Sequence, residues 1–101
     1  MQIISFFRWR DGLEPAKAFE AMAKRADWKY PEGVKNVGEY WPSGGDPAIP
    51  AVVAVDDYDD PKDLMEVDLF WGEYFEITHV PCMTSEEGLR YGGEIVARMA
   101  G

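Results

Sequence analysis

The stretch QIISFFRW, residues 2–9, is rich in β-branched and aromatic side chains and predicts the first strand of a sheet. Successive residues of a strand point to opposite faces. Ile4 and Phe6 therefore fall on one side, and Phe7 and Trp9 fall on the other. Neither side is polar enough to lie in water, so this strand belongs to a sheet that needs a cover on both faces.

The elements that follow are predicted from hydrophobic spacing and from turn residues. Apolar residues, Phe19 among them, recur at helical spacing after Pro15 and again after Asp60, which can accept hydrogen bonds at a helix start. Thr84 with Glu87 has the form of a capping box that begins a terminal helix. The predicted order is a strand at 2–9, a helix at 15–26, strands at 34–41 and 49–55, a helix at 61–72, a strand at 74–80 and a helix from residue 84 onward.

Gly92-Gly93 interrupts the apolar pattern of the terminal helix. Each glycine in a helix interior costs about 1 kcal/mol relative to alanine. The pair therefore marks a bend, a break, or a place where another backbone comes close.

The order strand, helix, strand, strand, helix, strand is the split βαβ arrangement of the α+β ferredoxin-like fold, followed here by a C-terminal helix. In that fold both helices lie on one face of a four-stranded antiparallel sheet, and the other face stays open. With 101 residues and 47% hydrophobic content, the chain is long enough for one core and too short for two. We expect residues 1–101 to form a single domain.

The open face of the predicted sheet requires a cover. Burying an aromatic side chain stabilises a protein by roughly 1.5 to 3 kcal/mol. If Phe7, Trp9 and Trp41 stayed in water, this stabilisation would be lost and the exposed apolar surface would favour aggregation. A second copy of the chain is one possible cover, and the last helix folded back over its own sheet is the other. Because two-fold homodimers are the commonest oligomers, we expect a homodimer.

Charge and composition exclude some classes of partner. The formal net charge of −9, from 19 acidic and 10 basic residues, repels phosphate backbones and anionic lipid headgroups, so we expect neither nucleic acid nor a membrane as partner. The first residues lack the pattern of a signal peptide, and no stretch approaches the ~20 apolar residues of a membrane span. Cys82 is the only cysteine, which fits a reducing compartment. Together these features predict a cytoplasmic protein.

Short motifs along about residues 2–82 are similar to those of a known family. They are Phe7-Arg8-Trp9, PEGVK at 31–35, Gly38 before Tyr40-Trp41, Val55-Asp56-Asp57, Trp71, and FEIT at 75–78 leading to Pro81. The chain resembles the domain-of-unknown-function 3303 group, which belongs with the dimeric α+β barrels. Two features depart from the family's pattern: the long loop of residues 42–50, and the His79-Val80 pair before the proline.

The resemblance implies a barrel in which two ferredoxin-like sheets face each other across a two-fold axis, with a cavity in each subunit. It brings no catalytic residue, because the family has no established activity. The wider superfamily includes small monooxygenases that use haem or no cofactor, isomerases, and proteins that bind small ligands. This likeness concerns the fold, and a fold alone does not define a function.

His79 is the only histidine and is therefore the candidate general acid or base at neutral pH. A lone histidine near a strand end and a proline is more often a packing or surface residue. A carboxylate within reach, such as Glu76 or Asp57, would favour the catalytic interpretation.

The acidic run Asp56, Asp57, Asp59 and Asp60 offers the oxygen ligands that Ca²⁺ and Mg²⁺ prefer. It lacks the glycine and the final glutamate of an EF-hand loop, and Asp60 already has a role at a helix start. A zinc site would need further cysteine or histidine residues. We expect no metal and no cofactor.

A mixture of polar and aromatic side chains, which we place on the open sheet face, is the remaining candidate site. A mostly apolar hollow with a few polar groups is typical of a small-molecule pocket, but also of a dimer interface. Our leading hypothesis is binding of a small apolar or aromatic molecule in a barrel cavity. The alternatives are a cofactor-free monooxygenase- or isomerase-like enzyme and a structural self-association protein. The predicted ligand-binding residues are Ser5, Phe7, Trp9, Trp41, Glu76 and Thr78, with Tyr40 nearby.

Overall fold

The order of elements in the computed structural model, which describes residues 1–44, 46 and 48–101, is β-α-β-β-α-β-α. This order confirms the predicted α+β ferredoxin-like fold with a C-terminal helix. The elements are β1 (Gln2–Trp9), α1 (Pro15–Asp27), β2 (Val34–Tyr40), β3 (Val52–Tyr58), α2 (Lys62–Trp71), β4 (Phe75–Pro81) and α3 (Ser85–Ala100).

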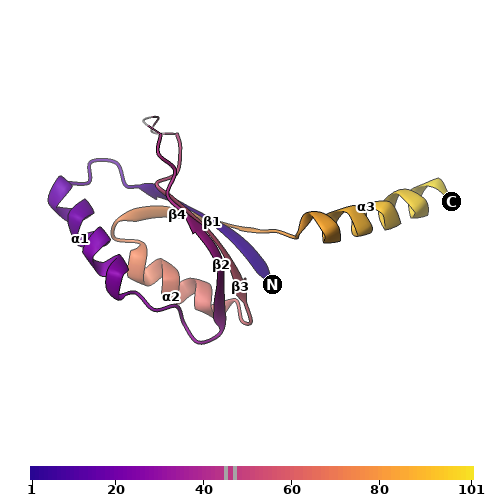
Figure 1. Cartoon of the computed structure of the whole chain (residues 1–101), viewed down its shortest axis with the longest axis horizontal. Coiled ribbons are helices and arrows are strands. Elements are labelled where there is room, and N and C mark those ends of the chain that lie inside the picture. Colours follow the sequence, from indigo (N-terminus) through magenta and orange to yellow (C-terminus); the bar gives the residue numbers. More distant parts are fainter. Residues whose placement is uncertain (45, 47) are drawn as a thin grey trace.

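The four strands form one antiparallel sheet in the order β2-β3-β1-β4, with α1 and α2 on one of its faces (Figure 1). We call this side the helix face and the other side the open face. In β1, Ile3, Ser5 and Phe7 are buried on the helix face, whereas Ile4 and Phe6 alternate with them and stay half-buried. The predicted alternation of the first strand is confirmed.

Aromatic side chains of α2 and of the segments beside it join the helices to the sheet. The ring of Trp71 packs edge-to-face with those of Trp28, Phe70 and Phe75, with centroids 5.7, 4.9 and 6.1 Å apart. Trp71 lies in the buried core, together with the fully buried Tyr74. Through Phe75 these contacts hold α2 against β4.

The third strand is shifted along the chain from its predicted position at 49–55. Pro50 has no N–H to contribute to a ladder, and the pairing of β3 with β1 begins at Val52 opposite Phe7. Ile49 precedes the strand in a turn, where its N–H donates to the Asp46 carbonyl. Of the predicted loop at 42–50, Gly45 and Pro47 lie outside the described residues.

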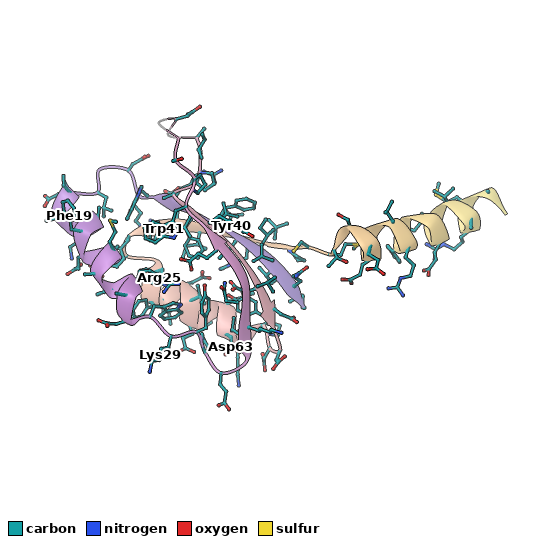
Figure 2. The ribbon with its side chains drawn as sticks, in the orientation of Figure 1. Phe19, Arg25, Lys29, Tyr40, Trp41 and Asp63 are labelled. Atoms are coloured by element: carbon teal, nitrogen blue, oxygen red, sulfur yellow. The ribbon has the colours of Figure 1, made fainter. Side chains whose placement is uncertain are left out.

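The inner surface of α1 differs from the predicted one. Ala21 is buried, whereas Phe19 is 71% exposed, so the expectation that Phe19 belongs to the core side is wrong. Figure 2 shows Phe19 near the outer end of α1. The residues that face the sheet, Ala18, Ala21, Met22 and Arg25, follow the i, i+3, i+4, i+7 spacing of one helical stripe.

α3 extends away from the rest of the chain and has no buried residue (Figure 1). Thr84 Oγ1 accepts a hydrogen bond from the Glu87 N–H at 3.1 Å, so the predicted cap is present. Gly92-Gly93 does not break the helix, and a Cβ at either position would meet nothing within 4 Å. The alternative in which the last helix covers its own sheet is wrong. No helix in the described part of the chain is long and apolar enough to cross a membrane.

Candidate functional site

A cavity of about 700 Å³ lies on the helix face of the sheet. Its walls come from the sheet, from the inner stripe of α1, from α2 and from the segments after β1 and β2. Sites for small molecules commonly have volumes of about 300 to 1,000 Å³. The cavity is therefore large enough for a small organic ligand. It lies on the helix face and not on the open face, where the sequence predicted the pocket.

All four tryptophans of the chain, Trp9, Trp28, Trp41 and Trp71, line this cavity. Trp9 stacks on Phe75 with ring centroids 4.4 Å apart. Aromatic walls of this kind offer large flat surfaces to an apolar ligand.

A hydrogen-bonded group of polar side chains forms another part of the wall. Arg25 of α1 donates two bonds to Glu39 of β2, from Nε to Oε2 and from Nη2 to Oε1, both at 3.0 Å. The Tyr30 hydroxyl and the Trp41 indole N–H donate to the same carboxylate at 3.1 and 3.0 Å. Figure 2 shows Arg25 and Trp41 on the helix face, with Tyr40 on the other side of the sheet.

The pKa of Glu39 results from two opposed effects. Burial alone would raise it, but hydrogen bonds from Arg25 and then Trp41 stabilise the carboxylate and hold the pKa below its ordinary value. Both carboxylate oxygens of Glu39 and the guanidinium fork of Arg25 are thus engaged within the protein.

Asp56 is a second carboxylate in the wall, and only 2% of it is exposed to solvent. Asn36 Nδ2 donates to its Oδ1 at 2.7 Å, and in the described part of the chain no other side chain donates to it. Burial raises the pKa of Asp56. Asn36 also donates to the Tyr30 hydroxyl at 3.2 Å, which connects Asp56 to the group around Glu39.

His79 takes part in a Ser-His-Asp chain. Its Nδ1 lies 2.7 Å from Ser5 Oγ and its Nε2 lies 2.6 Å from Asp68 Oδ1. A nucleophile must meet its substrate, but Ser5 is 1% exposed, and neither Ser5 nor His79 lines the cavity. The chain of hydrogen bonds joins α2 to the sheet, and the geometry supports a structural role for it.

The carboxylate partner of His79 is one that sequence reasoning missed. The two expected partners, Glu76 and Asp57, both lie on strands. Asp68 is on α2, and nothing in its sequence neighbourhood indicates that the helix carries it to the end of β4.

Of the six predicted ligand-binding residues, Phe7, Trp9 and Trp41 line the cavity. Ser5 shares the helix face with them but does not line the cavity, and it is bonded to His79. These four residues come together on one side of the sheet.

The other two, Glu76 and Thr78, lie on the open face. The register of β1 with β4 pairs Trp9 with Phe75 and Phe6 with Thr78, so Glu76 and Thr78 point away from the cavity. The expectation that all six residues share one open face is therefore wrong. Ligand binding by any of them stays a prediction.

The acidic run is divided by the alternation of β3. Asp56 is buried on the helix face and Asp57 is exposed on the other. Asp60 Oδ1 accepts the Lys62 N–H at 2.9 Å, as expected for a helix start. Among the residues that the structure describes, no three His, Cys, Asp or Glu side chains are grouped as a metal site would require.

Arg25→Met tests the charged pair in the cavity wall. We expect it to lower the free energy of unfolding at pH 7 by about 1 kcal/mol, because the half-buried carboxylate of Glu39 would lose the guanidinium that pairs with it. Since the pKa of Glu39 is lowered in the folded protein, its stabilisation is present above the ordinary pKa of 4.5 and disappears as the pH falls through the lowered value. Urea unfolding between about pH 3 and pH 7 measures the free energy of unfolding of both proteins. The difference between Arg25→Met and the unsubstituted protein should become smaller at the acid end of this range.

Lys17→Met is the matched control for that experiment. Lys17 bonds to Glu73 at 2.7 Å on the exposed surface, where solvent screens the pair. An equal loss of stability in both variants would contradict a special role for the Arg25 pair.

The family model described as Domain of unknown function (DUF3303) matches residues 1–96 of the chain. No curated protein and no solved structure matches it. The matched region contains the whole sheet and every described residue that lines the cavity.

Proposed function

The chain belongs to the DUF3303 family, as its short motifs indicated, and from this premise we propose that it is a homodimer whose subunits each bind a small, mostly apolar molecule. The family description assigns no activity, so the argument depends on the geometry of the cavity. The observation that carries it is that all four tryptophans surround one space of about 700 Å³.

Protein interiors are normally packed as closely as organic crystals. The cavity here is partly open, and Trp9 and Trp41 in its wall are exposed to solvent. A ligand that enters this space gains dispersion contacts with the rings and removes apolar surface from water, at about 25 cal/mol per Å². Retention of such a space in a chain of 101 residues favours a binding function over a purely structural one.

The homodimer part of the proposal concerns the open face. Ile4 and Phe6 of β1 and Val53 and Val55 of β3 form its half-buried centre, and Tyr40 at its edge is 63% exposed. Charged residues surround this centre: Arg8, Lys35, Asp57 and Glu76. An apolar centre with a polar rim is the usual anatomy of a protein interface.

Catalysis is the second candidate function, and Asp56 is the observation that favours it. An enzyme of the monooxygenase- or isomerase-like type needs a titrating group that reaches the substrate. Asp56 lines the cavity, whereas His79 does not. A buried carboxylate with a raised pKa can act as the base in such a reaction.

Binding is tested first with the neutral dye N-phenyl-1-naphthylamine, which fluoresces in apolar surroundings and can accept energy from the tryptophans. We expect saturable binding, and we expect Ala21→Phe to weaken it about tenfold or more, because the new ring occupies part of the cavity. Ala21 lines the cavity, so the ring is added at the space that the dye would occupy.

Ala23→Phe is the control, because Ala23 lies on the exposed side of the same helix. Equal affinity of both variants for the dye, or no binding by the unsubstituted protein, would contradict the proposed function. Native mass spectrometry of gently purified protein supplies an independent measurement, since it reports the subunit number and any retained molecule in one spectrum.

A further inference from the structure

We infer that the molecule bound in this cavity carries a protonated amine on its apolar body, and that the carboxylate of Asp56 pairs with this amine. The inference rests on the proposed binding function and adds the chemical class of the ligand. It follows from the balance of charge in the cavity wall and from the free oxygen of Asp56.

The charges of the polar wall do not balance within the protein. Arg25 is paired with Glu39 through two hydrogen bonds, which accounts for one positive and one negative group. Asp56 forms no salt bridge with any of the described residues. A buried carboxylate is costly unless it is paired or protonated, so this wall has a place for one positive charge.

The groups that face Asp56 from neighbouring elements do not supply that charge. Asn36 and Glu39 of β2 offer a neutral amide and a second negative charge. His79 of β4 acts on Asp56 only at a distance, where it favours a lower pKa, because its ring nitrogens are bonded to Ser5 and Asp68 and not to Asp56. No charged side chain among the described residues is therefore bonded to Asp56, and we assign that place to the ligand.

One oxygen of Asp56 is free to receive it. Asn36 donates to Oδ1, and the described residues offer no side-chain donor to Oδ2. Every fully buried side-chain oxygen or nitrogen of those residues has a hydrogen-bond partner. Because Oδ2 has none, it is not fully enclosed by protein. Asp56 is 2% exposed and lines the cavity, and we assign this small open part of its carboxylate to the cavity side.

An ammonium group fits this position better than a hydroxyl or a carboxylate. It brings a positive charge and three hydrogen-bond donors. A carboxylate would be repelled by both Asp56 and Glu39. Of the two remaining arginines at the cavity, Arg8 alternates with Phe7 and its side chain belongs to the open face. Arg10 lies seven residues beyond Ile3, the residue that pairs with Asp56, which is roughly 23 Å at the rise of a strand.

The test uses three compounds with the same apolar body: 4-phenylbutylamine, 4-phenylbutanol and 4-phenylbutyrate. Their affinities for the full chain are measured by isothermal titration calorimetry at pH 7.5. We expect the amine to bind about tenfold or more tightly than the alcohol, and the acid to bind most weakly. Asp56→Asn keeps the shape and the acceptor for Asn36, and should remove the preference for the amine while changing the affinity for the alcohol less than about threefold.

Asp57→Asn is the matched control, since it makes the same change one residue along β3 on the opposite face, and it should preserve the preference for the amine. Three results would overturn the inference: equal or tighter binding of the alcohol or acid by the unsubstituted protein, an amine preference that survives in Asp56→Asn, and no binding of the amine by a protein that binds N-phenyl-1-naphthylamine. In the last case the proposed function stands. Failure to bind the dye as well would instead refute the proposed function.

Discussion

Phe6→Glu is expected to convert the proposed dimer into a monomer. Phe6 lies in the middle of the open face, opposite Val53 on β3 and Thr78 on β4. A two-fold interface contains each substituted residue twice, and each buried, unpaired charge costs at least about 2 kcal/mol. The dissociation constant of the dimer should therefore rise by roughly a factor of 1,000. Sedimentation equilibrium over a range of concentrations measures this change.

Phe19→Glu provides the matched control, because Phe19 is exposed on α1 and not on the sheet. This variant should dimerise as the unsubstituted chain does. A dimer that persists in Phe6→Glu, or a parent chain that is monomeric throughout, would show that the open face is not the contact between subunits.

Trp71→Ala should destabilise the protein far more than the loss of the Arg25 pair does. Trp71 is buried against Trp28, Phe70 and Phe75, where it fixes α2 to the sheet. Truncating a buried tryptophan to alanine typically costs about 3 to 5 kcal/mol, a large part of the roughly 5 to 15 kcal/mol that holds a domain together. Urea unfolding at a fixed protein concentration should show this loss as a lower midpoint.

Trp41→Ala is the comparison for this experiment. Trp41 is 51% exposed, and its indole donates one hydrogen bond to Glu39. Its removal should cost about 1 kcal/mol. Similar losses in the two variants would mean that the buried aromatic contacts of Trp71 contribute little to stability.

The element order was predictable because each element has a local signal. The two-residue alternation of β1, the helical spacing after Pro15 and the Thr84 cap all follow from short-range geometry, and all are present in the structure. The start of the third strand was not predictable from the apolar run alone. Ile49 and the residues after it are apolar, yet the ladder begins only after Pro50, where backbone N–H groups become available.

The sequence predicts which residues of one strand share a face, but not which residues of two different strands lie on the same face of the sheet. Alternation separates Phe75 and Ile77 from Glu76 and Thr78. Which of these pairs shares a face with Phe7 depends on the register between β1 and β4, and a slip of one residue reverses the answer. Aligning the apolar side of each strand would have placed Ile77 opposite Phe7, as the structure does.

Asp56 shows why the polar part of the cavity was missed. In the sequence it begins an acidic run, and such a run usually indicates a surface loop. In the structure β3 continues through it to Tyr58, and Asp56 faces inward with Ala54 and Tyr58. Tyr58 lies two residues after Asp56 and therefore shares its face, and this spacing was the available signal. Nothing in the sequence indicated that Asn36, on a separate strand, donates a hydrogen bond to Asp56.

The two edges of the sheet limit how large an assembly can become. Exposed strand edges can recruit further strands and so build filaments. β2 forms one edge and is irregular between Asn36 and Gly38, with the charged Lys35 beside the irregularity. β4 forms the other edge and ends in Pro81, which has no N–H to donate. Because both edges resist growth of the hydrogen-bond ladder, the proposed dimer has no strand edge through which it would propagate into a fibre.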